Sequence, residues 1–384
     1  MRVSEYNLFK NLSVGSFALY FIFNFIDRGI SNIFLLIALL ICLIDYKSLF
    51  DSIKANYKLV VGIFLFSLYI SYVGIYHDSP IRELDNYYRF LLLLPLISIS
   101  FNDRNAVIIL FICAISALVH AIYVNAFFDD SFRLHGTSNN SITFGHMCAT
   151  LSMICIYYIF YKQYKPWINA ASAVIFLILL FLTETRGPII GIIFVVIYLT
   201  FVLKRDLETR LKFKTPIMIL SILLVSIIVI PNPLGERLKD ISNINLSEPL
   251  ETESYYLRER VYYLAYGIEE IKDNYIIGVG PQNVQNRMSE SLKLKKINRV
   301  KSADHLHNDF LDIILKFGIM SIILLFLIYF TLINSKNNQH NILLNILMIM
   351  LLSSQLTQSQ FAHHQAITFF ITLLYILQSK NKFS

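Results

Sequence analysis

The apolar residues of this chain gather in long blocks that contain few charged residues. They follow neither the period of 2 of a half-buried strand nor the 3.6-residue stripe of a surface helix. An apolar block of roughly 17–25 residues is long enough to cross a bilayer as a helix. The pattern therefore predicts an all-α integral membrane protein with about 12 transmembrane helices, at residues 11–26, 29–44, 59–76, 86–102, 105–126, 142–161, 166–183, 187–203, 215–231, 310–334, 341–358 and 364–379.

One connection differs from the others because it is long and hydrophilic. Residues 232–309 separate nine predicted helices in residues 1–231 from three in residues 310–384. Within this connection, residues 254–273 place apolar side chains near helical spacing, which predicts an amphipathic helix. The run GVGPQN that follows is typical of a turn. A second helix is predicted at 284–297.

Composition agrees with this fold. The 384 residues are 56% hydrophobic and 15% charged, whereas about a quarter of the residues in a soluble domain are charged. The four cysteines lie inside apolar blocks, where a thiol behaves as a small hydrophobic side chain. Their spacing predicts neither a metal site nor a disulfide framework. The net charge of +7 is common in nucleic-acid-binding proteins, but here it reflects membrane topology, and no nucleic-acid partner is expected.

The basic residues orient the helices. With a cytoplasmic N-terminus, sixteen of them fall in cytoplasmic segments and five in the short loops of the other side, as the positive-inside rule requires. The cytoplasmic set is Arg2, Lys10, Lys47, Lys54, Lys58, Arg104, Lys162, Lys165, Lys204, Arg205, Arg210, Lys212, Lys214, Lys336, Lys380 and Lys382. The other set is Arg28, Arg82, Arg89, Arg133 and Arg186. Both termini are therefore predicted to be cytoplasmic, and the long hydrophilic connection extracytoplasmic.

The run TETRGPIIG offers the first candidate for chemistry. Arg186 lies between two apolar helices, and ionisable residues at membrane depth are costly and mark functional sites. A guanidinium is always charged and suits bidentate contacts to phosphate. The alternative is a helix-end arginine that reaches the interface or pairs with Glu184.

The predicted loop helix offers the second candidate, in the run SYYLRERVYYLAYG. Arg258 and Arg260 are two residues apart and point to different faces of a helix, so we expect one of them to reach a site. The alternative is a solvated helix in which Glu259, Glu269 and Glu270 pair with the arginines.

The run DHLHNDFLDIILKFGI offers the third candidate. His305 and His307 precede an apolar helix, and a histidine there can take a proton from a hydroxyl near neutral pH. The alternative is a capping segment with Asn308 or Asp309 as N-cap. The two interpretations are compatible.

The run RLHGTSNNSITFG offers the fourth candidate, through Arg133 and His135, although such a polar run is more often a loop with an N-cap. Arg89 is a weaker candidate, and His363 and His364 are weaker still. No HExxH or similar spacing predicts a metal site, so we expect no metal. Extracytoplasmic acidic residues that could hold a divalent ion are the alternative.

Taken in order, the four motifs resemble the O-antigen ligase and O-antigen polymerase superfamily. Its signature is His, then Asn, Ser or Gln, nine residues, and a glycine, which His307, Asn308 and Gly318 match. The family often has a second glycine three residues later, where this chain has Ser321. The resemblance covers about residues 130–320.

The resemblance implies a GT-C-like glycosyltransferase of the bacterial inner membrane, with its active site at the periplasmic face beside a large helical periplasmic loop. Ligases of this superfamily move a finished polysaccharide from undecaprenyl diphosphate to the lipid A–core oligosaccharide, and polymerases move it to another lipid-linked repeat. TETRGP and HLHN are closer to the ligases. The implied partners are the undecaprenyl-diphosphate-linked donor, the lipid A–core acceptor and membrane lipids, without a cofactor.

The implied chemistry assigns a role to each candidate. Arg186 and Arg260 would bind the donor diphosphate, and His307 would orient or deprotonate the acceptor hydroxyl. Direct displacement would invert the anomeric carbon, and a diphosphate leaves without a general acid. The residues expected to bind substrate are Arg258, His305, Asn308, Arg133 and Arg89. A flippase for lipid-linked oligosaccharides is the alternative outside this class, although it needs no large outer loop.

Overall fold

The computed structural model describes residues 3–99, 102–127, 134, 140–203, 255–294, 303–334 and 338–379. In these residues the chain forms helices and no strands. The α-helices are α1 (Val3–Phe23), α2 (Arg28–Ile44), α3 (Tyr46–Ala55), α4 (Tyr57–Tyr76), α5 (Ile81–Leu92), α6 (Asp103–Phe127), α7 (Ser141–Tyr157), α8 (Pro166–Leu182), α9 (Gly187–Leu203), α12 (Tyr255–Asn274), α13 (Val284–Leu294), α14 (Asp309–Phe317), α15 (Ile319–Ile333), α16 (Asn338–Thr357) and α17 (His364–Ser379). Short helical turns are η1 (Leu94–Ser98), η3 (Tyr158–Lys162), η4 (Pro281–Asn283) and η5 (Gln360–Ala362).

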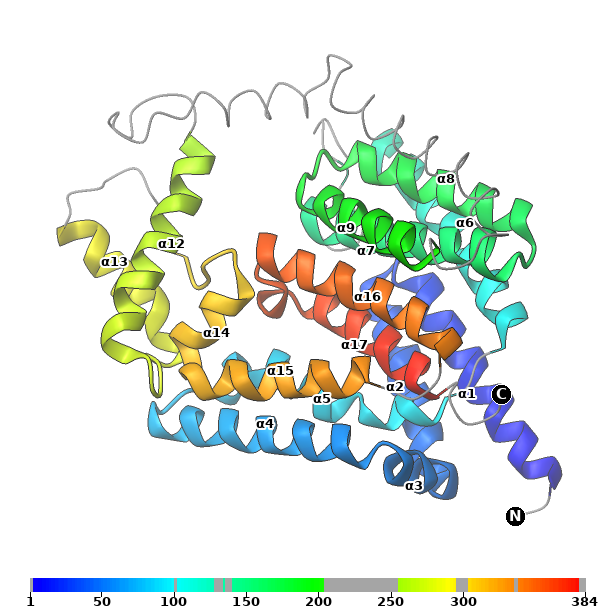
Figure 1. The fold of residues 1–384 in the computed structure, drawn as a ribbon, viewed down its shortest axis with the longest axis horizontal. Helices are drawn as coiled ribbons and strands as arrows, with labels where there is room; N and C mark the ends of the chain where they lie inside the picture. The colour runs from blue at the N-terminus through cyan, green and yellow to red at the C-terminus, as the bar shows by residue number, and fades with distance from the viewer. Residues whose placement is uncertain are drawn as a thin grey trace.

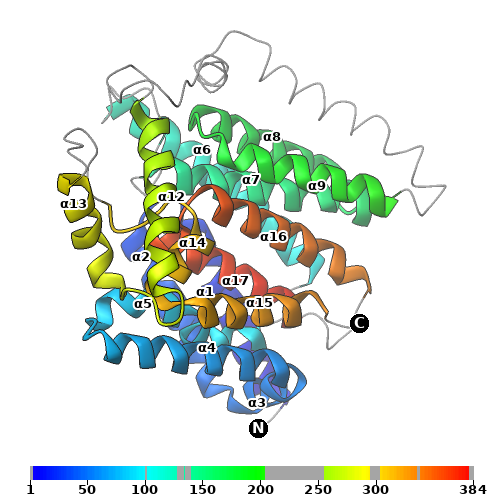
Figure 2. The same cartoon turned by 60° about the vertical axis from the view of Figure 1, so that its left-hand side comes forward.

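Most of the long helices have their axes roughly aligned with one another, as Figure 1 shows for α4, α15, α16 and α9. Helices α12, α13 and α14 gather at one end of this bundle, and α3 lies at the other; the turned view in Figure 2 keeps the same separation. We call these the α12 end and the α3 end. The first turn of α1 and the last turn of α17 lie toward the α3 end, so the described chain starts and finishes on the same side.

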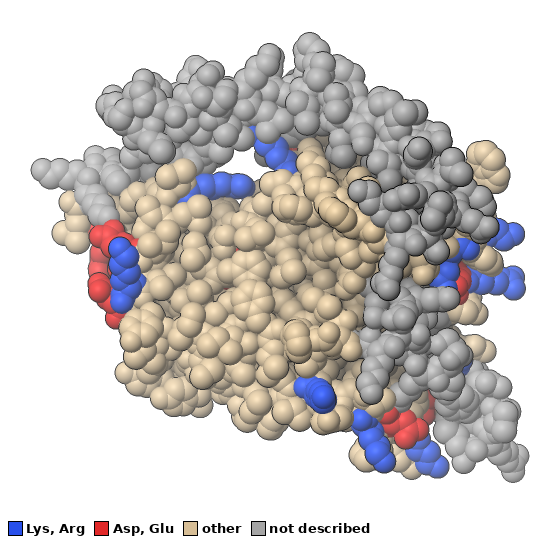
Figure 3. All heavy atoms as spheres, in the orientation of Figure 1, with Lys and Arg blue, Asp and Glu red and all other residues tan. Residues whose placement is uncertain are grey.

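The apolar helices are compatible with a membrane protein. By length and composition, three described helices suffice to cross a membrane, at Tyr57–Tyr76, Asp103–Val124 and Ser141–Lys162. Helices α2 and α3 together give a fourth candidate, bent by 87° between them. Six shorter apolar helices lie beside these. Figure 3 shows a broad uncharged face, with charged side chains gathered toward its margins, which is the surface that a lipid environment favours.

Two predicted spans are not single helices. At 86–102 the chain forms the end of α5 and the turn η1, with the break beside Pro95, whose missing N–H interrupts a helix. At 310–334 the chain breaks at Gly318 into α14 and α15. The predicted span at 215–231 lies outside the described residues. The predicted loop helices are confirmed as α12 and α13.

The described residues form two apolar cores. The larger runs through the bundle from α1 to α17. The smaller joins α12 and α13 to the segment before α14, through Tyr263, Tyr266, Met288 and Leu306, which are all buried. Burial of such side chains stabilises by roughly 1.5–3 kcal/mol each. The smaller core therefore holds the segment that contains His307 against α12.

A close backbone junction joins this smaller unit to the bundle. The N–H groups of Val279 and Gly280 donate to the carbonyls of Leu315 and Lys316 at 2.8 and 3.1 Å, which satisfies carbonyls that the end of α14 leaves unpaired. Gly318 has a φ of +79°, and a Cβ there would collide with the carbonyl oxygen of Ile276. The family glycine is therefore explained by its backbone conformation and by this close approach.

We expect Gly318→Ala to destabilise the protein by about 1–3 kcal/mol, because it adds strain at a positive φ and a backbone clash. Gly15→Ala is the matched control, since a Cβ there meets no atom within 4 Å, and it should be neutral or slightly stabilising. All four cysteines are buried, so a thiol-reactive dye reports thermal unfolding. Equal melting temperatures for the two variants would contradict this account of the junction.

Candidate functional site

The segment before α14 holds His307 between two anchored residues. The side chain of Leu306 is fully buried, and its N–H donates to Asp312 Oδ1 at 3.1 Å. Asn308 caps α14, with Oδ1 accepting the N–H of Leu311 at 3.1 Å, as the capping alternative predicted. Between them His307 has a φ of +56°, a conformation that is uncommon outside glycine and is concentrated at functional sites.

Asp309 joins this segment to the turn between α16 and α17. Its fully buried carboxylate accepts the N–H of Gln360 at 2.9 Å and that of Phe361 at 3.1 Å. The side chain of Phe361 stacks on Tyr87 of α5, with ring centroids 5.0 Å apart. Two turns that are about fifty residues apart in the chain are thereby held side by side.

His307 has three side-chain neighbours from three segments. Its Nδ1 lies 2.9 Å from Oε1 of Gln358, which follows α16. Its ring stacks with Tyr263 of α12, with ring centroids 5.8 Å apart and planes inclined by 27°. The ring of His305 lies edge-on at 4.5 Å, and His305 Nδ1 is 2.6 Å from Asp304 Oδ1. We call residues 305–308 the HLHN segment. Residues from this segment, from α12 and from the α16–α17 turn therefore all contact the imidazole of His307.

A second histidine continues this network. Nε2 of His363 lies 2.9 Å from Nε2 of Gln358 and 3.3 Å from Nδ2 of Asn140. Asn140 is the N-cap of α7, and its Oδ1 accepts the N–H groups of Ile142 and Thr143. The polar run that leads into α7 therefore reaches the site through its last residue.

The TETRGP turn lies near the end of α16. Arg186 is half-buried and directly precedes α9. A Cβ on the next residue, Gly187, would lie 2.7 Å from Oγ1 of Thr357 and 3.2 Å from Nε2 of His146. The start of α9 thus packs against the residue that precedes Gln358. This brings the Arg186 turn close to His305, His307 and His363, which we call the histidine cluster.

Burial sets the charge state of the two histidines. Burial first, and then the neighbouring His305, lowers the pKa of His307 to about 4, and the charge of Arg260 adds to this shift. Burial, followed by His305, also lowers the pKa of His363 to about 4. Both imidazoles are therefore neutral at neutral pH, and each carries one N–H and one lone pair.

The other residues that the sequence predicted for the site differ in how much the structure describes of them. Arg260 is half-buried on α12, close enough for its charge to act on His307. The side chain of Arg258 and the whole of Arg133 and His135 lie outside the described residues. Asn308 uses both amide atoms structurally, since its Nδ2 donates to the carbonyl of Leu356 at 3.2 Å.

Arg89 belongs to a separate polar cluster. It contacts Asp85 at 2.8 Å, Thr368 at 2.7 Å and Nδ1 of His364 at 3.3 Å. The adjoining cavity, which Arg28 also lines, measures about 30 Å³.

Sequence reasoning missed Gln358, did not single out Asn140 within its polar run, gave His146 no role, and ranked His363 among the weakest candidates. Gln358 is 2% exposed and His146 is fully buried, with both ring nitrogens unpaired within the described residues. The available signal was the polar run SSQLTQSQ at the end of a predicted span, because polar groups are costly where a helix lies in lipid. Nothing local to that run indicated which glutamine faces a histidine.

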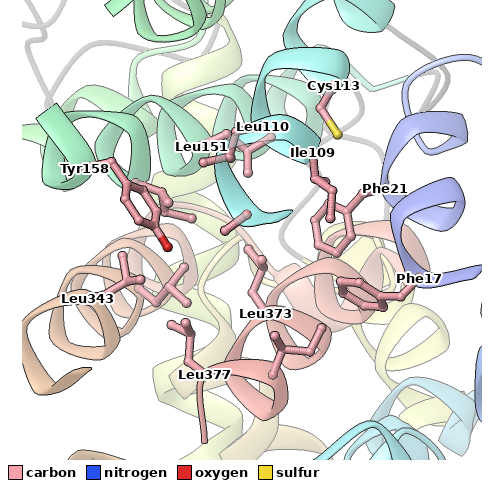
Figure 4. A pocket seen from close by; sticks show the side chains of 14 residues that line it. Phe17, Phe21, Ile109, Leu110, Cys113, Leu151, Tyr158, Leu343, Leu373 and Leu377 are labelled. Atoms are coloured by element: carbon pink, nitrogen blue, oxygen red, sulfur yellow. The ribbon is translucent and has the colours of Figure 1, made fainter. Parts of the chain in front are cut away.

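Other features of the described residues carry less chemistry. They contain no group of three His, Cys, Asp or Glu side chains placed to hold a metal ion. An apolar cavity of about 80 Å³ lies among α1, α6, α7, α16 and α17. Figure 4 shows Leu343 and Leu377 lining it, at the ends of α16 and α17 that are opposite the histidine cluster. Its lining is almost wholly apolar, so it offers no site for polar chemistry.

One family model matches part of the chain. Residues 171–326 match the family model described as O-antigen ligase. This segment contains Arg186, Arg260, His307 and Gly318, and the match confirms the resemblance to the O-antigen ligase superfamily, whose members transfer glycosyl groups. No curated protein matches the chain.

We expect Asp309→Asn to lower the free energy of unfolding. An amide in place of the carboxylate sets an NH₂ group against one of two buried N–H donors, which costs about 1–3 kcal/mol. Thermal unfolding with the thiol-reactive dye measures this loss. Asp304→Asn is the control, because the Asp304 side chain is 68% exposed, and it should shift stability by less than about 0.5 kcal/mol. Equal stability of the two variants would show that Asp309 does not hold the two turns together.

Proposed function

We propose that this chain, whose segment 171–326 belongs to the O-antigen ligase family, transfers polysaccharide from undecaprenyl diphosphate to the lipid A–core oligosaccharide. The reaction would take place at the α12 end of a GT-C-like membrane fold, facing the periplasm of a bacterial inner membrane. The observation that carries the proposal is the meeting of the Arg186 turn, Arg260 of α12 and His307 at one end of the bundle.

The donor brings its own leaving group. The acceptor hydroxyl attacks the anomeric carbon, the bond from that carbon to the diphosphate oxygen breaks, and the diphosphate departs with the electron pair. In this proposal Arg186 and Arg260 bind the diphosphate and stabilise the charge that develops on it. Such a leaving group needs no general acid, so the absence of paired carboxylates from the sequence motifs is no obstacle.

In the same proposal His307 receives the proton of the acceptor hydroxyl. Its neutral imidazole offers a lone pair at neutral pH. A bound diphosphate would bring negative charge close to the ring and raise the pKa of His307 toward the neutral range, which strengthens the base when substrate is present. Attack on one face of the sugar with departure from the other inverts the anomeric carbon.

A polymerase that extends a lipid-linked repeat would use the same groups, because only the acceptor differs. The resemblance of TETRGP and HLHN to the ligases favours ligation. A flippase would need none of the convergence around His307.

Complementation of a strain that lacks this protein tests the proposal, with lipopolysaccharide and carrier-linked glycan separated on gels. Loss of a ligase leaves bare core and long polymer on the carrier lipid. Loss of a polymerase leaves core with a single repeat, and loss of a flippase leaves no glycan on the outer face. We expect the first pattern, and either of the others would replace the assignment.

In the same strain, His307→Ala, Arg186→Ala and Arg260→Ala should each fail to restore transfer, with losses on the order of 10²-fold or more. Arg287→Ala is the control, because Arg287 pairs at 3.2 Å with Glu270 in a largely exposed contact, and such pairs contribute little. Each variant is first checked for normal abundance and a single elution peak in detergent. Full transfer by both the His307 and Arg186 variants would rule out this site.

A further inference from the structure

The amide of Asn140 has its orientation fixed by the helix that it caps. Its Oδ1 accepts the N–H of Ile142 at 2.9 Å and that of Thr143 at 3.3 Å. A reversed amide would set its NH₂ group against these two donors, so Nδ2 is the atom that faces His363. Because Nδ2 only donates, Nε2 of His363, 3.3 Å away, presents its lone pair.

Gln358 is oriented by the same nitrogen. Its Nε2 lies 2.9 Å from Nε2 of His363, and only the NH₂ end of an amide can donate to that lone pair. The other end of the amide, Oε1, then lies 2.9 Å from Nδ1 of His307. A carbonyl oxygen only accepts, so Nδ1 of His307 carries the proton and Nε2 carries the lone pair.

We infer that Asn140, His363 and Gln358 form a hydrogen-bond relay that sets the tautomer of His307 and makes Nε2 its proton-accepting atom. We call this set the tautomer relay. Its catalytic meaning rests on the proposed function, in which His307 deprotonates the acceptor hydroxyl. The three members are positioning residues, because they act through His307.

Through the relay, the N-cap of α7 determines which nitrogen of His307 carries the proton. Among the described contacts of the relay, the start of α7 supplies the fixed reference, since its backbone N–H groups cannot exchange roles. His363 and Gln358 can each reverse their polarity, but they must do so together with His307. A neutral histidine outside such a network takes either tautomer, and with the proton on Nε2 His307 would have no lone pair directed at the substrate.

The relay predicts an unusual effect of Asn140→Asp. Aspartate caps a helix as well as asparagine does, so α7 is preserved. The second carboxylate oxygen, however, only accepts, so His363 must place a proton on Nε2. Gln358 then reverses its amide, its NH₂ group faces Nδ1 of His307, and the proton of His307 moves to Nε2. We expect kcat to fall on the order of 10³-fold with a smaller change in KM.

Asn140→Ser is the matched comparison. Serine also caps α7, but its single hydroxyl is occupied by the cap, so it removes the donor to His363 without placing an acceptor there. His363 and Gln358 are then no longer held in one polarity, so we expect a mixture of the two tautomers of His307 and a smaller fall in kcat than for Asn140→Asp.

The decisive measurement is ¹⁵N NMR of the full-length protein in lipid nanodiscs, with ¹⁵N-labelled histidine. The signals of His307 are identified by their loss in His307→Ala. Wild type should show the proton on Nδ1, Asn140→Asp should show it on Nε2, and Asn140→Ser should show a mixture of the two tautomers. A wild-type His307 with its proton on Nε2, or an Asn140→Asp variant that keeps it on Nδ1, would overturn the relay.

A second pair of variants covers the case in which Asn140→Asp does not fold. Gln358→Met removes the acceptor for Nδ1, so we expect a mixture of tautomers and a fall in kcat. Gln358→Glu keeps an acceptor there, so it should retain the Nδ1 proton and recover activity. Equal tautomers and rates for both variants would overturn the relay. The spectra need no substrate, so the relay can fail or stand whether or not the chain transfers polysaccharide.

Discussion

The carboxylate of Asp309 is the contact on which the site depends most. It is fully buried and accepts two backbone N–H groups from residues 360 and 361. A buried carboxyl group without hydrogen-bond partners is costly, so the backbone of the α16–α17 turn has to lie where its N–H groups can donate to this one. That constraint places Gln358 and His363 next to His307. The bonds of Asn308 Nδ2 to the carbonyl of Leu356 and of His307 to Gln358 join the same two segments, but both come from side chains that are more exposed than Asp309.

The position of this contact follows from the physics of a helix bundle in lipid. Irregular backbone exposes N–H and C=O groups that lipid cannot satisfy, so turns and breaks in helices are confined to protein-covered places. At the α12 end, the smaller apolar core covers the segments that carry His307 and the GVG turn. The same cover lowers the pKa of His307 and His363 by burial. The smaller apolar core therefore covers the irregular backbone and also keeps His307 neutral.

Local patterns in the sequence predicted much of this. The amphipathic helix α12 and the cap by Asn308 follow from spacing and residue type, which act over a few residues. Gly318 was singled out by the family signature instead. The contacts of Gln358 and His363 did not follow, because each depends on a partner from another segment of the chain. The break of the predicted span 310–334 was missed for a related reason, since Gly318 adopts its conformation to meet the backbone of a distant turn.

The central claim is that donor diphosphate binds where the Arg186 turn, α12 and the HLHN segment converge. A lipid-diphosphate-linked glycan with a photoreactive group on the isoprene unit next to the diphosphate tests it directly. After irradiation in nanodiscs and proteolysis, the account predicts label in peptides that contain residues 183–190, 255–264 or 303–309. Label confined to peptides that line the apolar cavity near Leu343 and Leu377, toward the α3 end, would contradict it.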